Sequence, residues 1–152
     1  MICDKAGVSR MSFYRYYSTK EDIFINYSDE RFADFYENCI QGKTITPHTF
    51  CEDTISYLGR YRDQIRAINR SHLLYIFVGQ FEKYISYIMS QTTNDIQLRF
   101  KENPLLVPYF AGGLANTLSY WCKHDFVESE DEIAHRLKEI LTQTTFPRDN
   151  DK

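Results

Sequence analysis

Basic and hydroxyl side chains gather within the first twenty residues of the chain. This stretch contains four basic residues and one acidic residue, so it carries a net charge of +3. The whole chain carries −3, which leaves −6 on the remaining residues. Guanidinium, ammonium and hydroxyl groups bind phosphate oxygens, and a nucleic acid is the polyanion that such a segment suits. If the protein binds phosphate, we expect the contact here.

Catalytic chemistry has weaker support. The four histidines are isolated from one another: His48, His72, His124 and His135. Glu132 and His135 have E-x-x-H spacing, but a di-metal site in a helical bundle needs this spacing twice and two further carboxylates. The four cysteines form no C-x-x-C pair and lack the basic setting of a reactive thiol. We therefore predict no enzymatic activity, no metal site and no cofactor.

Short helices must position the N-terminal side chains. Residues 2–7 are predicted to form one that ends at Gly7, a residue able to adopt the left-handed conformation of a helix end. Ser9 is a suitable N-cap for a second helix over residues 10–17. Two short helices joined by a glycine-containing turn form a helix-turn-helix. Ser18 and Glu21 then have the spacing of a capping box, which predicts a long helix through about residue 40.

The rest of the chain is predicted to be an all-α body. Six glycines and four prolines are few for a β-sandwich, and 43% hydrophobic residues suffice for a core. Thr46 and Pro47 predict the start of an amphipathic helix that runs as far as Ile68. Further helices are predicted over residues 73–89, 109–123 and 129–144, the last with a capping box of Ser129 and Glu132. Residues 92–103 suit a loop or a short surface helix, and the tail from Pro147 is predicted to be disordered.

The chain carries no signal for membrane insertion or export. Its longest apolar run, residues 73–78, is too short to cross a bilayer, and the N-terminus lacks a basic-then-apolar pattern. We expect a cytoplasmic protein with no membrane partner.

The stretch from Ala6 to Phe24 resembles the helix-turn-helix of the TetR family of transcriptional regulators, whose pattern is A-G-V-S-x-x-T-F-Y-x-[HY]-F-x-[SN]-K-E-[DE]-L. Ten positions match it directly: Ala6, Gly7, Val8, Ser9, Phe13, Tyr14, Tyr16, Lys20, Glu21 and Asp22. Ser12, Tyr17 and Ile23 replace Thr, Phe and Leu. The resemblance implies a DNA-binding domain with its connecting helix over residues 1–40, and a ligand-binding and dimerisation domain over residues 46–146.

Eight residues are predicted to bind double-stranded DNA: Ser9, Arg10, Met11, Ser12, Tyr14, Arg15, Tyr16 and Lys20. Arg10 can pair with guanine in the major groove, and Met11 can touch a thymine methyl group. The hydroxyl groups suit phosphates, and Arg15 suits a base or a phosphate. By resemblance, Lys20 is a phosphate anchor at the start of the next helix.

Members of the family have another helix before this pair, whereas this chain begins at Met1 inside the second helix. Val8 and Phe13, which we expect to point inward, would then lose part of their apolar cover. We predict that residues 1–18 are poorly anchored and that DNA binding is weak. The alternative function is a dimerisation module that no longer binds DNA.

The C-terminal sequence, with Gly112-Gly113-Leu114, Trp121 and Ser129, is similar to the branch of dihydroxyacetone-kinase regulators. The resemblance implies a homodimer formed by the last two helices. The predicted interface residues are Phe110, Leu114, Thr117, Leu118, Trp121, Ile133, Leu137 and Leu141, with packing inside one chain as the alternative for some of them.

Family members sense small molecules in a cavity of the helical body. The predicted pocket residues are Tyr57, Tyr61, Phe77, Phe81, Tyr84 and Tyr120, with plain core packing as the alternative. No cluster of positive charge faces these positions in the pattern, which favours a neutral or cationic ligand. The resemblance thus implies a regulator, in the simplest case a repressor that a small-molecule effector releases from its operator.

Overall fold

The computed structural model describes residue 3, residues 6–93 and residues 95–145, and every regular element in these ranges is helical. In chain order the elements are α2 (Arg10–Tyr16), α3 (Lys20–Phe35), the π-helical turn η1 (Tyr36–Ile40), α4 (Pro47–Gly59), α5 (Arg62–Arg70), α6 (Leu74–Gln91), α7 (Asp95–Glu102), α8 (Leu106–Lys123) and α9 (Glu130–Thr145). The all-α class predicted from the sequence is confirmed. The predicted disorder from Pro147 onward and half of the predicted helix over residues 2–7 lie outside the described residues.

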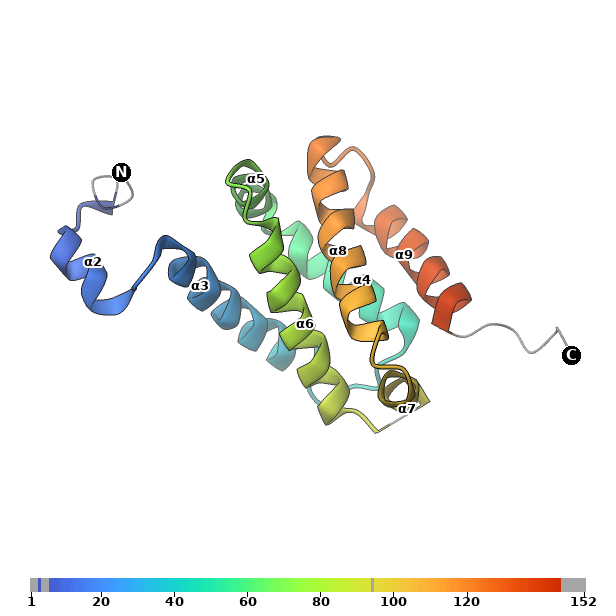
Figure 1. The fold of residues 1–152 in the computed structure, drawn as a ribbon. Coiled ribbons are helices and arrows are strands. Elements are labelled where there is room, and N and C mark those ends of the chain that lie inside the picture. Colours follow the sequence, from blue (N-terminus) through green and yellow to red (C-terminus); the bar gives the residue numbers. More distant parts are fainter. Residues whose placement is uncertain (1–2, 4–5, 94, 146–152) are drawn as a thin grey trace, which may run out of the picture.

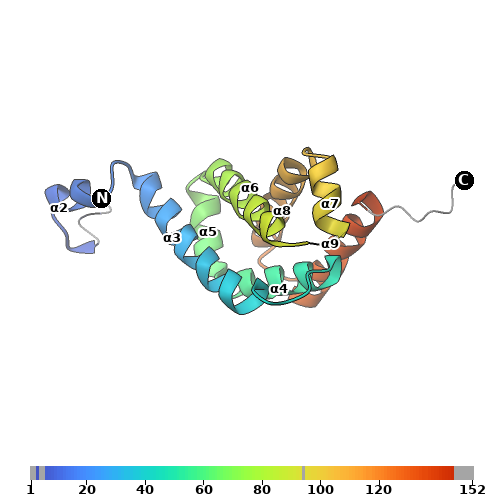
Figure 2. The same cartoon turned by 90° about the horizontal axis from the view of Figure 1, so that it is seen from below.

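Two pairs of helices make up most of the body. α6 packs against α8, and α4 packs against α9. The views in Figure 1 and Figure 2 show these pairs as two layers of the body. α3 packs along α6, while α5 contacts α8 and α7 contacts α6. α2 lies beyond the body at the far end of α3, on the side opposite to α9 (Figure 2).

The core is built from the apolar stripes of α4, α6 and α8. Its least exposed large side chains are Trp121 and Leu118 of α8, Ile55 of α4 and Ile88 of α6, each less than 2% exposed. Burying an aliphatic side chain of this size contributes roughly 1.5–3 kcal/mol relative to leaving it in water. This packing holds fixed the three helices that, with α3 and α5, surround the cavity described below.

Side-chain caps fix where α2, α3, α4 and α9 begin. As predicted, the Thr46 hydroxyl accepts a hydrogen bond from the Thr49 backbone N–H at 3.1 Å, and Pro47 opens α4. The predicted capping box of Ser129 and Glu132 is also present, with bonds of 2.8 and 3.2 Å in the two directions.

The capping box of α3 is shifted by one residue from the prediction. Thr19 rather than Ser18 is the N-cap, and Asp22 rather than Glu21 is its partner. The Asp22 carboxylate accepts hydrogen bonds from the backbone N–H groups of both Ser18 and Thr19, at 2.7 and 2.9 Å. Because one carboxylate satisfies two backbone donors, this register is favoured over the predicted one.

The single helix predicted from Pro47 to Ile68 is wrong, because the structure has two helices there. The backbone leaves the helical conformation at Tyr61, where φ is −112° and ψ is 33°. The buried Gly59 lies directly against the Glu130 side chain of α9, a close approach that a larger residue would obstruct. The break directs α5 onto α8 and keeps Ile65 buried.

Two other boundaries also differ from expectation. Residues 92–103 contain α7, which is the short helix that the sequence left as one of two alternatives. α8 begins at Leu106, before Pro108 rather than after it. Proline is tolerated in the first turn of a helix, since the backbone N–H that it lacks has no intrahelical partner there.

Candidate nucleic-acid interface and effector cavity

The turn before α2 contains a left-handed glycine and a backbone hydrogen bond. Gly7 has the predicted left-handed conformation, with φ at +64°, and the Val8 backbone N–H donates to the Cys3 carbonyl oxygen at 3.1 Å. This is the hydrogen bond of a Schellman helix end. The Ser9 hydroxyl then accepts from the Ser12 backbone N–H at 3.0 Å and caps α2, as predicted.

α2 buries none of its residues and presents polar side chains to solvent. Met11 is 79% exposed, Tyr14 66% and Tyr16 74%. The remaining exposed members of the predicted DNA-binding set in this region are Ser9, Arg10, Ser12 and Arg15. The side chain of Lys20, at the start of α3, lies outside the described residues. Seven of the eight predicted side chains are therefore exposed, and their contact with DNA stays a prediction.

The apolar side chains of this region are only partly covered, as the sequence predicts. The Phe13 ring lies 5.7 Å from the Tyr17 ring and is half-buried. Val8 is 46% exposed, which agrees with the expectation that it loses part of its apolar cover. The reason is that α2 makes no extensive contact with another described helix.

The helical body contains a cavity of about 100 Å³ between α3, α4, α5, α6 and α8. Five of the six predicted pocket residues line it: Tyr57, Tyr61, Phe77, Phe81 and Tyr84. The sixth, Tyr120, is 51% exposed and lies against the His124 ring in a tilted arrangement, with the ring centroids 4.0 Å apart. The prediction for Tyr120 is therefore corrected, because its side chain faces solvent rather than the cavity.

One wall of the cavity is polar. Arg31 of α3 lies in this wall, and its Nη1 donates to the Tyr61 hydroxyl at 3.3 Å. The Tyr57 hydroxyl is 2.8 Å from the Arg31 carbonyl oxygen and 2.7 Å from Asp34 Oδ2, and it can donate to one of them at a time. Burial raises the pKa of Tyr57 and the bonds to Tyr61 and Asp34 raise it further, so this phenol stays protonated.

Sequence reasoning missed Arg31. The pattern of the pocket positions showed no positive cluster, yet the structure places one cation beside them. A signal was present, since Tyr27 and Arg31 are four residues apart and so share a face of the predicted long helix. Both residues line the cavity.

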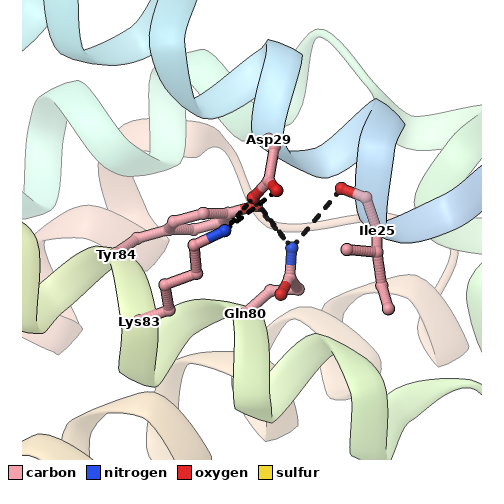
Figure 3. A network of polar contacts seen from close by, with 5 residues as sticks. All are labelled: Ile25, Asp29, Gln80, Lys83 and Tyr84. Atoms are coloured by element: carbon pink, nitrogen blue, oxygen red, sulfur yellow. Dashed lines mark hydrogen bonds and ion pairs between the residues drawn. The ribbon is translucent and has the colours of Figure 1, made fainter. Parts of the chain in front are cut away.

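A polar network joins α3 to α6 at the edge of the same cavity (Figure 3). The Asp29 carboxylate accepts hydrogen bonds from Lys83 Nζ at 2.7 and 2.9 Å, from the Tyr84 hydroxyl at 2.9 Å and from Gln80 Nε2 at 3.1 Å. Gln80 also reaches the Ile25 carbonyl oxygen at 3.4 Å. We call these residues the Asp29 network. It ties the helix that carries α2 to a helix that walls the cavity.

The charge of Asp29 depends on this network. Burial acts to raise the pKa of Asp29, but the bonds from Lys83, Tyr84 and Gln80 outweigh it and lower the pKa below its usual value. A carboxyl whose pKa is lower in the folded state stabilises the fold at neutral pH, and this contribution is lost as the pH falls through the folded pKa.

We therefore expect Asp29→Asn to reduce the free energy of unfolding by about 1 kcal/mol at pH 7, a value discounted for the partial exposure of the carboxylate. The difference from the wild type should shrink as the pH falls below about 4, where the wild-type carboxyl also becomes neutral. Urea unfolding of both proteins between pH 7 and pH 3 measures it. Asp63→Asn is the control, since the Asp63 side chain is 91% exposed. A difference between wild type and Asp29→Asn that is constant with pH would contradict the role of the charge.

The surface formed by α8 and α9 is apolar and hollowed. A hollow of about 410 Å³ lies between α4, α8 and α9, where Tyr109 is 56% and Ile140 50% exposed. Gly112 and Gly113 border it, and a methyl group built on either glycine would meet no atom within 4 Å. This surface is open to the close approach of another apolar surface.

The residues predicted to form a dimer interface divide into two groups. Phe110, Leu114, Thr117 and Leu137 are partly exposed and border the hollow. Leu118 and Trp121 are fully buried, and Ile133 and Leu141 are 5% and 9% exposed. For Leu118, Trp121 and Ile133 the predicted role is corrected to packing inside one chain, because helices of the same chain already cover them. Leu141 lines the hollow, so its role at the interface stays a prediction.

No catalytic site is visible in the described part of the chain. No group of three or more histidine, cysteine, aspartate or glutamate side chains there could hold a metal ion. His135 Nε2 lies 3.6 Å from Glu139 Oε1. The carboxylate of Glu132, the residue with E-x-x-H spacing to His135, caps α9 instead. Burial raises the pKa of Cys51 to about 11, so its thiol is protonated and a poor nucleophile.

Among the described helices, none is long and apolar enough to span a bilayer.

The described chain is an all-α body with an internal cavity, preceded by a short helix whose side chains are largely exposed, and this arrangement suits a transcriptional regulator. Comparison with known families agrees: residues 46–143 match the family model TetR_C_8, described as a transcriptional regulator C-terminal region. Because this match covers more than half of the chain, the chain belongs to the TetR-type regulator family. No curated protein and no solved structure gave a significant match.

Proposed function

We propose that this regulator binds an operator in double-stranded DNA through α2, as a cytoplasmic homodimer, and that it is a repressor released by a small-molecule ligand. One observation carries the proposal: the body belongs to a regulator family, and α2 projects from it with its polar side chains exposed. Arg10 and Met11 lie in the first turn of α2, where a recognition helix contacts base edges. The exposed hydroxyl of Tyr14 suits a phosphate oxygen.

Selection from a random pool of DNA duplexes tests this proposal. We expect the protein to enrich one sequence over competing DNA, with affinity that falls steeply as salt is raised, since phosphate contacts release counterions. A protein that forms a dimer but enriches no sequence would instead be a dimerisation module without DNA binding, and the proposal would fail.

The proposed dimer uses the surface of α8 and α9. The two DNA-reading helices of a dimer must reach half-sites about 34 to 36 Å apart, and a twofold-symmetric dimer can present both helices at this separation. Tyr109 and Ile140 are the large exposed apolar groups at the hollow, and the bare backbone at Gly112 and Gly113 permits close helix contact. The partly exposed Phe110, Leu114, Thr117 and Leu137 complete the proposed interface.

We expect Ile140→Asp to weaken the dimer roughly tenfold or more, because it places an unpaired charge in a buried apolar contact. Analytical ultracentrifugation over a range of concentrations measures the dissociation constant. Val127→Asp is the matched control, since Val127 is 82% exposed and lies in the turn before α9, away from the hollow. Equal behaviour of the two variants would exclude this surface as the interface.

α3 is the proposed route from ligand to DNA. It leads from α2 into the body, contributes Arg31 and Phe24 to the cavity, and is joined to α6 by the Asp29 network. A ligand that pushes α3 away from α6 would strain this network and shift α2, which changes the separation of the two reading helices. By linkage, such a ligand must bind more tightly to the DNA-free form than to the DNA-bound form.

A further inference from the structure

Among the described residues that line the cavity, one cationic side chain, Arg31, has no anionic partner. The Nε of Arg31 is buried and makes no hydrogen bond in the described part of the chain. Nη1 donates to the Tyr61 hydroxyl in a weak bond of 3.3 Å, while the rings of Tyr27 and Tyr61 lie 5.7 and 6.0 Å from the guanidinium carbon. A buried donor without an acceptor is unfavourable, and it is more so on a charged group.

The acidic residues near Arg31 on α3 are already engaged or face solvent. Asp34 accepts from Asn38 with Oδ1 and from Tyr57 with Oδ2. Asp29 is held by Lys83 in the Asp29 network, and Glu30 is exposed. No carboxylate oxygen of the described chain lies within salt-bridge distance of Arg31, so its charge is available to a ligand.

Most of the remaining cavity wall is apolar. Phe24, Phe77 and Phe81 form one aromatic side, with ring centroids 5.9 and 4.4 Å apart in succession, and Ile65 and Ile68 of α5 form another. The volume of about 100 Å³ is somewhat less than that of a cavity that binds benzene, roughly 150 Å³. The wall thus suits a compact apolar group with one negative charge at its edge.

We propose that the effector is a small apolar carboxylic acid, whose carboxylate is bound by the Arg31 guanidinium and whose hydrocarbon part packs among Phe24, Phe77 and Phe81. The inference rests on the proposed function and specifies its ligand. It replaces the neutral or cationic ligand that the sequence pattern favoured. A planar guanidinium binds a carboxylate through two parallel hydrogen bonds, and the single cation of this wall neutralises a single negative charge.

Matched acids and amides test the charge requirement. Benzoate, phenylacetate and hexanoate would each be compared with the corresponding amide by isothermal titration calorimetry, because each pair has nearly the same shape and differs in charge. We expect at least one acid to bind one site per chain, about 10- to 100-fold more tightly than its amide. Equal binding within every pair, or binding of no acid, would overturn the proposal.

Substitution of Arg31 tests the location. Arg31→Gln should lower the affinity for the acid about 10- to 100-fold and leave that for the amide unchanged, while Arg31→Lys should recover part of the loss. Arg70→Gln, on the exposed end of α5, is the matched control and should bind like the wild type. Thermal unfolding of each variant confirms the fold. An acid that binds Arg31→Gln as tightly as wild type would place the site elsewhere and refute the proposal.

The effect on DNA separates this inference from the proposed function. If the acid binds through Arg31 and also lowers the affinity of the protein for the selected duplex, both the ligand inference and the proposed function are supported. If it binds through Arg31 but leaves DNA affinity unchanged, the ligand site stands and the proposed release mechanism fails.

Discussion

Changing Arg10 and Arg15 together to alanine should lower affinity for the selected duplex about 100-fold or more, since each contact to a base or phosphate is worth roughly 1–3 kcal/mol. Both side chains are exposed on α2, which buries none of its residues, so the fold of the body should be unchanged. Fluorescence anisotropy with a labelled duplex gives the dissociation constants, and circular dichroism checks the helix content.

The matched control for this double variant is Arg70→Ala with Lys101→Ala. It removes the same two positive charges from exposed positions on α5 and α7. We expect it to bind DNA within about threefold of the wild type, because the lost charges are far from the proposed contact and are screened by salt. Equal losses in the two double variants would mean that net charge, rather than α2, governs binding.

Replacing Trp121 by alanine should lower the free energy of unfolding by about 3–5 kcal/mol, the usual loss for a fully buried large aromatic residue. Trp121 has no exposed surface, and its indole N–H donates to the Glu128 carbonyl oxygen at 2.9 Å. Its ring packs edge-on against Phe126, which has a positive φ of 55° that packing must support. The variant thus loses core contacts and loosens the turn between α8 and α9.

Urea unfolding followed by circular dichroism measures this loss. Trp121→Phe, which keeps an aromatic ring but removes the hydrogen bond, should lose less than half as much. If Trp121→Ala instead left each chain stable and only weakened the dimer, Trp121 would belong to the interface predicted from the sequence and not to the core.

Local chemistry explains which parts of the fold were predictable. Ser9, Thr46 and Ser129 cap helices through hydrogen bonds to residues three positions away, so the sequence contains both partners of each bond. The break between α4 and α5 was not predictable, because the apolar periodicity continues through it. Near the break, Gly59 lies against the Glu130 side chain of α9, and this contact joins residues that are distant in the sequence.

The same distinction applies to the candidate sites. The exposed face of α2 follows from one short motif. Trp121 and Leu118 lie on a helix that is apolar on most sides, so periodicity could not decide whether they face the body or a partner chain. Arg31 was missed because its importance comes from Tyr57 and Tyr61 of the α4–α5 region, which only the fold brings beside it.

The most direct test of the central claim is methylation interference on the selected duplex, since methylation of guanine N7 blocks contacts in the major groove. We predict interference at guanines in two half-sites about one helical turn apart, with the signal at one guanine of each half-site lost selectively in Arg10→Ala. Interference that is absent from the major groove, or that is unchanged in Arg10→Ala, would contradict the assignment of α2 as the DNA-reading helix.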